Sequence, residues 1–234
     1  MTERGMIFNG DMVQALLDGR KTQTRRIMAI QPEHSELGLR RVIDSKNVRD
    51  NGKYFWSQSD ARGLKMRSKV FGCPYGEVGD RIWVRETYQG PLFDFDQMDA
   101  YCKDSTPFEK AQFCIYKADG KPAPEFFDAD DNLHCCWRPS IHMPRWASRI
   151  LLEITDVRVE RLNAISQADA IAEGAPPSHP SIDCVSQEYG FPDFSRSWFG
   201  QTWQHIYGEE SWQANPWVWV IEFKRIEGGG HATD

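Results

Sequence analysis

The sequence predicts an α+β protein in which a curled, barrel-like mixed sheet is flanked by helices. Short segments with strand-like patterns are interrupted by two or three segments with helical spacing, and no sustained alternation of strand and helix runs along the chain. The chain has 234 residues, of which 40% are hydrophobic and 26% charged, a composition typical of globular proteins. This length allows one domain with large insertions, which is the organisation we expect.

The first expected elements lie before residue 29. Residues 6–8 form a short apolar strand, and the helix that follows has Asp11 as its expected N-cap and Gln14 at the capping-box position. Gly19 is expected to end this helix in a left-handed conformation. The β-branched residues within 22–27 then predict an extended segment.

Two long segments without convincing periodicity are predicted to be insertions, at about residues 29–70 and 89–135. Between them, the turn-forming residues 76–80 lead into an alternating strand at 81–87, which we expect to belong to a hairpin. Inside the second insertion, residues 113–116 predict one short strand.

The second half of the chain begins with a long predicted strand at 150–162, which is rich in β-branched residues. A helix follows, for which Ser166 and Asp169 form the expected capping pair and Gly174 the expected end. The buried side of this helix is expected to consist of Ala168, Ile171 and Ala172.

The C-terminal part contains a proline-rich third insertion at about 175–197, an aromatic helix at 198–207 and a final strand at 217–223. These elements complete a single predicted domain, residues 1–226. The glycine-rich tail, residues 227–234, is predicted to be disordered.

Charge is distributed unevenly along the chain, whose formal net charge is -6. Between Arg20 and Lys69 there are 13 Lys or Arg against 5 Asp or Glu, so a basic segment is attached to an acidic body. Such a segment either contacts phosphate groups or forms a solvated insertion, and charge patterning alone does not separate the two.

Several classes of protein are excluded by what the sequence lacks. No segment reaches the about 18 apolar residues of a membrane helix, and the first residues lack the apolar core of a signal peptide. We therefore expect a cytoplasmic protein that does not bind a membrane. The motifs of phosphate-binding loops, dinucleotide folds and the common hydrolases are also missing.

The six cysteines predict neither a disulfide scaffold nor a metal centre. The best zinc candidate would combine His134, Cys135, Cys136 and His142. Adjacent cysteines rarely share one metal ion, so we expect no metal and no cofactor.

A loop between two predicted strands combines cationic and aromatic residues. Its candidate binding residues are Arg138, His142, Arg145 and Trp146. Arginine contacts and aromatic stacking suit a single-stranded nucleic acid or a flipped base. The alternative is a packing corner in which Trp137 and Trp146 are buried.

Gly19, Lys21 and Arg26 fit the spacing GxKxxExR, with Thr24 in the position of the glutamate. With the preceding helix, the turn at 79–80 and the final strand, this motif resembles the ASCH domain of the PUA-like superfamily. The resemblance covers about half of the chain and implies a PUA-like curled barrel with long insertions. The longer form is similar to ASCH proteins encoded by phages and prophages.

One branch of the family, the small bacterial N4-acetylcytidine amidohydrolases, also has threonine at this position. The resemblance to this branch implies that Lys21, Thr24 and Glu173 are catalytic, with Glu173 in the helix after the long central strand. It also implies a metal-independent amidohydrolase that acts on N4-acylated cytidine. Substrate or nucleic-acid contacts are then expected from Arg20, Arg25 and Arg26 as well as from the cationic loop.

The chemistry of these residues is consistent with amide hydrolysis. Thr24 is a weak nucleophile that needs a base or else positions a water. Lys21 can act as that base if burial and neighbouring arginines lower its pKa. Glu173 would pass a proton to the departing amine, with Glu86 as the reserve carboxylate. Because successive residues of a strand face opposite sides, Lys21 and Thr24 would point apart if both lay in one regular strand, so this site requires Lys21 to lie in the turn.

Two alternatives remain open. In the first, the protein is a binding module that holds RNA or a modified base without turnover. In the second, it is a ribonuclease that uses Lys21, His142 and Glu173 as acid and base groups.

Overall fold

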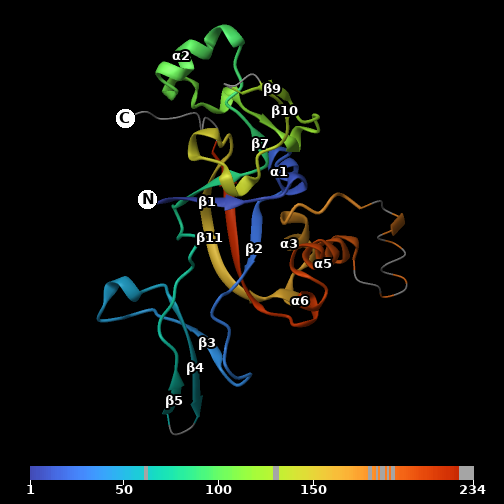
Figure 1. Ribbon diagram of the computed structural model, residues 1–234. Helices are drawn as coiled ribbons and strands as arrows, with labels where there is room; N and C mark the ends of the chain where they lie inside the picture. The colour runs from blue at the N-terminus through green and yellow to red at the C-terminus, as the bar shows by residue number, and fades with distance from the viewer. Residues whose placement is uncertain are drawn as a thin grey trace.

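The protein has a mixed α+β fold built on a five-stranded sheet (Figure 1). The computed structural model describes residues 1–60, 63–128, 132–178, 181–182, 184, 188, 190 and 193–226. The strands of the central sheet are, in spatial order, β1 (Glu3–Ile7), β6 (Arg81–Arg85), β11 (Leu151–Arg161), β12 (Trp217–Arg225) and β2 (Gln23–Ile27). The predicted class is confirmed, as are the predicted long central strand and final strand.

The sheet is mixed and strongly curved. β1 and β6 are parallel, whereas the other neighbouring strands are antiparallel. The long strands β11 and β12 bend along their length in Figure 1. Within the described part of the chain, no ladder joins β1 to β2, so the expected barrel is not closed. β2 is therefore an edge strand.

The helices lie mainly beside the β2 edge. They are α1 (Gly10–Leu17), α2 (Met98–Lys103), α3 (Gln167–Ala172), α5 (Phe194–Tyr207) and α6 (Glu210–Gln213). Figure 1 shows α3, α5 and α6 together on one side of the sheet, next to β2, whereas α2 lies in a separate insertion. The predicted aromatic helix is confirmed as part of α5. No helix in the described residues has both the length and the apolar character that crossing a membrane requires.

Short 3-10 helices connect these elements. They are η1 (Val48–Asp50), η2 (Phe95–Gln97), η3 (Thr106–Phe108), η4 (Ala111–Phe113), η5 (Lys117–Asp119), η6 (Ser140–His142), η7 (Arg145–Ala147) and η8 (Leu162–Ala164). The core is formed where α1 packs on the sheet, and Val13, Ile82, Leu152 and Ile221 are fully buried there.

The cap of α1 is Asn9 and not the predicted Asp11. The Asn9 side chain accepts a hydrogen bond from the main-chain N–H of Met12 at 2.8 Å, and Asn9 has the extended conformation of a cap. Asp11 lies inside the first turn, because the helix begins earlier than its apolar stripe indicates. The left-handed conformation expected of Gly19 is confirmed, with φ 74°.

The capping box of α3 is confirmed, but the predicted buried face is wrong. Ser166 and Asp169 bond reciprocally, and Gly174 has φ 103°. Ala168 and Ile171 are exposed and Ala172 is half-buried, whereas Ala170 is fully buried. The cap fixes where this six-residue helix begins, while packing against α5 decides which face is covered.

The first predicted insertion, whose sequence shows no convincing periodicity, contains a three-stranded antiparallel sheet. Its strands are β3 (Gly38–Arg41), β4 (Tyr54–Asp60) and β5 (Gly63–Arg67), in that spatial order. We call residues 38–71 the flap, and Figure 1 shows it extending from the lower end of the central sheet. Trp56 attaches it to the core: its ring is 5.2 Å from that of Trp217 between centroids, and 1% of the residue is exposed.

The strand predicted at 81–87 is confirmed as β6, but it does not belong to a hairpin. β6 pairs with β1 in parallel and with β11 in antiparallel orientation. The turn before it is held by distant segments, since Gly79 donates to the carbonyl of Ile154 at 2.9 Å. Asp80 accepts the main-chain N–H of Thr2 at 2.7 Å.

The second insertion contains short strands: β7 (Tyr88–Gln89), β8 (Ile115–Tyr116), β9 (Glu125–Phe127) and β10 (Leu133–Cys135). β8 confirms the strand predicted near 113–116, and it pairs with β7. The tail 227–234 and part of the third insertion, 175–197, lie outside the described residues.

Candidate functional site

A pocket of about 160 Å³ opens along the free edge of β2, between the start of α1 and the helix α5. It is lined by Ile7, Asn9, Met12, Thr24, Arg25, Arg26, Glu173, Phe199, Thr202, Trp203, Ile206 and Tyr207. One side of the pocket is thus polar and the other largely aromatic. Thr24 and Glu173, two of the three predicted catalytic residues, lie in this lining.

The third predicted residue, Lys21, is paired with Glu173 directly behind the pocket. Its Nζ donates to Glu173 Oε2 at 2.7 Å and to the Glu173 carbonyl at 2.8 Å. The lysine side chain is 0% exposed and the glutamate side chain 4% exposed, so this is a buried ion pair. Lys21 therefore reaches the pocket only through Glu173.

Local structure brings these two residues together although they are 152 residues apart in the sequence. Lys21 lies in the turn after α1 and before β2, as the chemistry requires, and its main-chain N–H donates to Ala15 at 2.9 Å. Glu173 is the C-cap residue of α3. The left-handed Gly174 that follows lets the chain turn away while the carboxylate stays directed at Lys21.

Burial lowers the pKa of Lys21. Desolvation is the largest cause, and the positive charges of Arg26 and Arg25 act in the same direction, whereas Glu173 opposes them. A neutral amine is therefore accessible at lower pH than for an exposed lysine. The sequence-based expectation of a lowered lysine pKa agrees with this environment.

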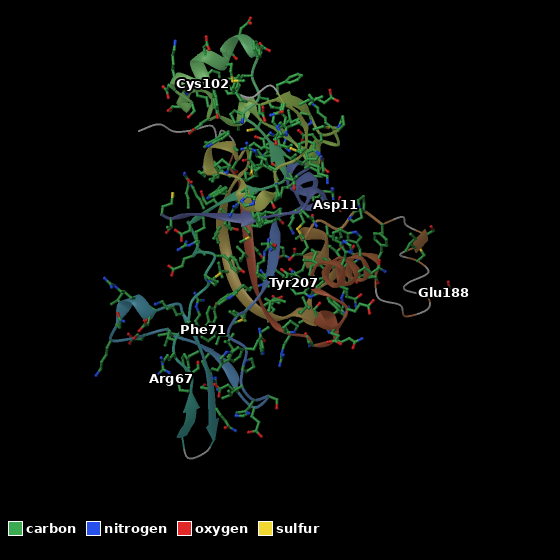
Figure 2. The ribbon with its side chains drawn as sticks, viewed as in Figure 1. Asp11, Arg67, Phe71, Cys102, Glu188 and Tyr207 are labelled. Carbon is green, nitrogen blue, oxygen red and sulfur yellow. The ribbon has the colours of Figure 1, made fainter. Side chains whose placement is uncertain are left out.

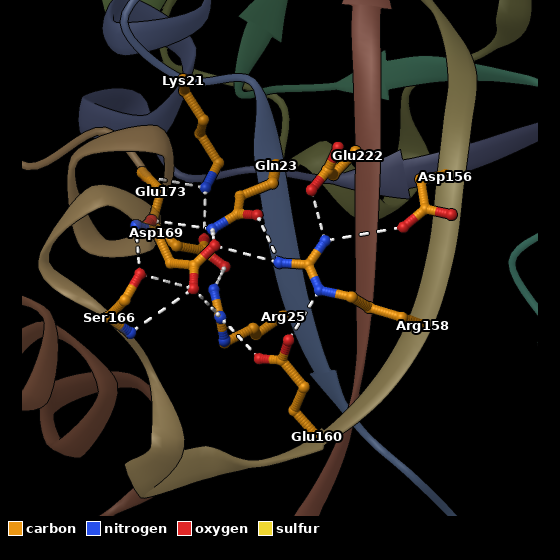
Figure 3. Close-up of polar contacts among 10 residues, drawn as sticks. All are labelled: Lys21, Gln23, Arg25, Asp156, Arg158, Glu160, Ser166, Asp169, Glu173 and Glu222. Atoms are coloured by element: carbon orange, nitrogen blue, oxygen red, sulfur yellow. Dashed lines mark hydrogen bonds and ion pairs between the residues drawn. The ribbon is translucent and has the colours of Figure 1, made fainter.

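A second cation holds the other oxygen of Glu173. Arg25 Nη1 is 3.3 Å from Glu173 Oε1, and its Nη2 contacts Glu160 at 3.0 Å and Asp169 at 3.3 Å. Figure 3 shows that the network continues to Arg158, which bonds to the same Glu160 and Asp169. Both oxygens of Glu173 are thus fixed in direction by buried positive charge.

The main chain of β2 contributes a donor at its open edge. Met28 donates to the carbonyl of Trp217 at 3.1 Å, and Thr22 accepts from Phe223 at 2.9 Å. Even-numbered residues of β2 therefore direct their main-chain groups toward β12. The N–H of Arg25, an odd-numbered residue, points to the free edge, where Arg25 lines the pocket.

The aromatic wall of the pocket was missed by sequence reasoning. Phe199, Trp203 and Tyr207 come from successive turns of α5, and the Trp203 and Tyr207 ring centroids are 4.4 Å apart. Figure 2 shows Tyr207 at the end of α5 toward the middle of the molecule. Their spacing of four residues is a signal that could have identified one aromatic face of this helix.

The other predicted binding residues are divided between the pocket and distant surfaces. Arg26 lines the pocket and donates to the carbonyl of Ile7 at 2.7 Å. Arg20 lies just outside, where it pairs with Asp18 and donates to the Gly174 carbonyl at 2.8 Å.

The cationic loop is not part of this pocket. Arg138 and His142 are exposed, Arg145 pairs with Glu3 at 3.0 Å, and Trp146 packs against a separate cluster around Tyr88. The ribonuclease alternative requires His142 to lie close to Lys21 and Glu173, and the structure does not bring it to them.

The reserve carboxylate Glu86 belongs to a different environment. It accepts two hydrogen bonds from Arg149, at 2.9 and 3.0 Å, and Arg149 also pairs with Asp119. Burial raises the pKa of Glu86, although Arg149 acts in the opposite direction. Glu173 is therefore the carboxylate that the pocket presents.

Within the described residues, no group of three or more His, Cys, Asp or Glu is arranged to hold a metal ion. His134, from the zinc candidate, instead lies 2.7 Å from a carboxylate oxygen of Asp128.

Replacing Gly174 with alanine is expected to lower the free energy of unfolding by about 2–4 kcal/mol, from left-handed strain and overpacking together. Its φ is 103°, and an added Cβ would lie 2.9 Å from Cβ of Ala15. Gly19→Ala is the matched control, because Gly19 has φ 74° but no atom within 4 Å of the added Cβ. Urea denaturation should give the smaller loss for Gly19→Ala, and equal losses would contradict this packing.

No protein-family model, curated protein or solved structure matches this chain in the comparisons made.

Proposed function

We propose that the protein is a metal-independent amidohydrolase that removes an acyl group from the N4 amine of a modified cytidine, within a PUA-like ASCH fold. The observation that carries this proposal is the buried Lys21–Glu173 ion pair, whose glutamate lines, together with Thr24, a pocket with an aromatic wall. The open, curved sheet and the turn position of Lys21 are compatible with the fold part of the proposal.

The reaction assigns a role to each polar group of the pocket. Thr24 orients a water whose oxygen bonds to the acyl carbon, while the water proton passes to Glu173. The N–H of Arg25 can donate to the oxyanion that forms on the acyl oxygen. The C–N bond then breaks, Glu173 returns the proton to the N4 amine, and cytidine and a carboxylic acid are released.

Lys21 acts on this reaction through Glu173. Because its Nζ contacts the carboxylate and lies outside the pocket, it fixes the orientation of Glu173 and exchanges the proton with it. Its lowered pKa makes such an exchange easier than for an exposed lysine. Phe199, Trp203 and Tyr207 provide faces on which a pyrimidine ring can pack.

Purified protein is expected to release cytidine from N4-acetylcytidine in the presence of a metal chelator. Thr24→Val keeps the shape of a buried side chain and removes only the hydroxyl, and it should lower kcat/KM by about 10²-fold or more. Lys21→Ala should lower it at least as much. Chromatographic detection of cytidine measures both.

Lys224→Ala is the control. Lys224 is exposed on β12, and its one ion pair within the described residues is with Glu153. It should retain wild-type turnover. Absence of turnover in the wild type, or full activity of Thr24→Val, would contradict the proposed reaction.

A binding module is the second candidate, and one observation favours it. Both oxygens of Glu173 are already engaged by Lys21 and Arg25, an arrangement that also suits a rigid wall for a bound base. Saturable binding of N4-acetylcytidine without any release of cytidine would support this candidate.

A further inference from the structure

We propose that the outer face of the flap is a binding platform for single-stranded nucleic acid. This site is separate from the pocket, and the inference does not depend on the reaction proposed there. Figure 2 shows Arg67 on the flap, apart from Tyr207 at the pocket.

The flap has an inner face that is committed to packing. Trp56 contacts Phe71 and Trp217, with ring centroids 6.1 and 5.2 Å away, and its indole N–H donates to the carbonyl of Ile30 at 3.2 Å. Tyr54 lies two residues before it on the same face, and its ring is 5.4 Å from that of Trp219. Side chains that alternate with these residues must therefore face away from the core.

The outer face combines an aromatic ring with two arginines. Phe55 lies between Tyr54 and Trp56 and is directly opposite Arg40 in the register of β3 and β4. Arg67 shares this face from β5, with its guanidinium carbon 4.0 Å from the centroid of the Phe55 ring. Arg40 and Arg67 are both exposed, and Phe55 is half-buried.

These two arginines are not neutralised by neighbours. Among the residues that the structure describes, neither Arg40 nor Arg67 forms an ion pair with a carboxylate. The flap as a whole, residues 38–71, contains nine Lys or Arg and three Asp or Glu, although the complete chain has a net charge of -6. Its charge is thus opposite to that of the rest of the protein.

This combination matches the chemistry of a single strand. Every unpaired base offers a flat face that can stack on a ring such as Phe55, while the phosphates on either side can contact guanidinium groups. An open sheet whose aromatic residue is flanked by cations provides both contacts at once. An acidic protein surface would use the positive charge but would leave the aromatic ring without a role.

The test is fluorescence anisotropy with fluorescein-labelled twelve-nucleotide oligomers of uridine and of thymidine. We expect saturable binding whose affinity falls with salt, and the two oligomers distinguish RNA from DNA as the preferred strand. Phe55→Ala should weaken binding about tenfold or more through lost stacking. Arg40→Gln with Arg67→Gln should reduce the slope of log Kd against log salt by about 1.4, the value for two lost phosphate contacts.

The matched control is Lys121→Gln with Lys224→Gln, which removes two exposed positive charges outside the flap. It should bind like the wild type. Circular dichroism checks that each variant is folded. If Phe55→Ala does not fold, the paired arginine variant still tests the proposal. Equal binding by the arginine variant and the control would overturn the proposal. Binding to phosphatidylserine vesicles with no binding to either oligomer would also overturn it, in favour of a lipid surface.

Discussion

Replacing Glu173 with alanine is expected to lower the free energy of unfolding by about 3–5 kcal/mol, because it leaves buried positive charge without its partner. Lys21 would keep only the main-chain carbonyl of residue 173, while its side chain remains 0% exposed. Arg25 would lose the same carboxylate but retain Glu160 and Asp169. The unpaired lysine therefore accounts for most of the expected loss.

Urea denaturation measures this loss. Asp156→Ala is the control, since Asp156 belongs to the rim of the same network but is 51% exposed and lies 3.6 Å from Arg158. It should change stability by less than about 1 kcal/mol. A double variant, Lys21→Met with Glu173→Leu, should recover most of the loss because no lysine charge is left unpaired. Equal destabilisation by Glu173→Ala and Asp156→Ala would contradict the buried-pair interpretation.

Trp56→Ala is expected to destabilise the protein by about 3–5 kcal/mol, the usual cost of deleting a buried tryptophan side chain. Trp56 is 1% exposed and packs between the flap and Trp217 of the central sheet. The substitution creates a cavity at the junction and leaves the carbonyl of Ile30 without its indole donor. The same denaturation experiment gives the magnitude.

Phe55→Ala on the outer face provides the comparison for Trp56→Ala. Phe55 is half-buried, and its ring contacts Arg67 on the outer face. Phe55→Ala should therefore lower the free energy of unfolding clearly less than Trp56→Ala does, although the two residues are adjacent in β4. If both variants lost the same amount, the assignment of an inner and an outer face to the flap would be wrong.

Several features that local chemistry determines were predicted, although the N-cap of α1 was misplaced by two residues. The Ser166–Asp169 capping box and the left-handed glycines at 19 and 174 need only neighbouring residues, and they were found from the sequence. The flap strands were missed because β4 is recognised through its partners, with Trp56 packed on Trp217 from the opposite end of the chain. The hairpin predicted for β6 was wrong because its partners, β1 and β11, are far away in sequence.

The candidate site was predicted in part. The motif and the family resemblance pointed to Lys21, Thr24 and Glu173, of which Thr24 and Glu173 line one pocket and Lys21 is paired with Glu173. The aromatic wall was not identified, because α5 was recognised as a helix without regard to which face meets β2. The cationic loop, predicted to bind substrate or nucleic acid, does not line this pocket, and its role stays a prediction.

The strand order also determines when the site can form during synthesis. β2 is completed within the first 27 residues, but its ladder partner β12 spans Trp217–Arg225. The ion pair of Lys21 likewise cannot form until Glu173, 152 residues later, has been synthesised. A nascent chain therefore exposes the β2 edge and its charges until β12 has been synthesised. Such late, non-local closure gives the domain a high contact order, for which slow folding is the rule.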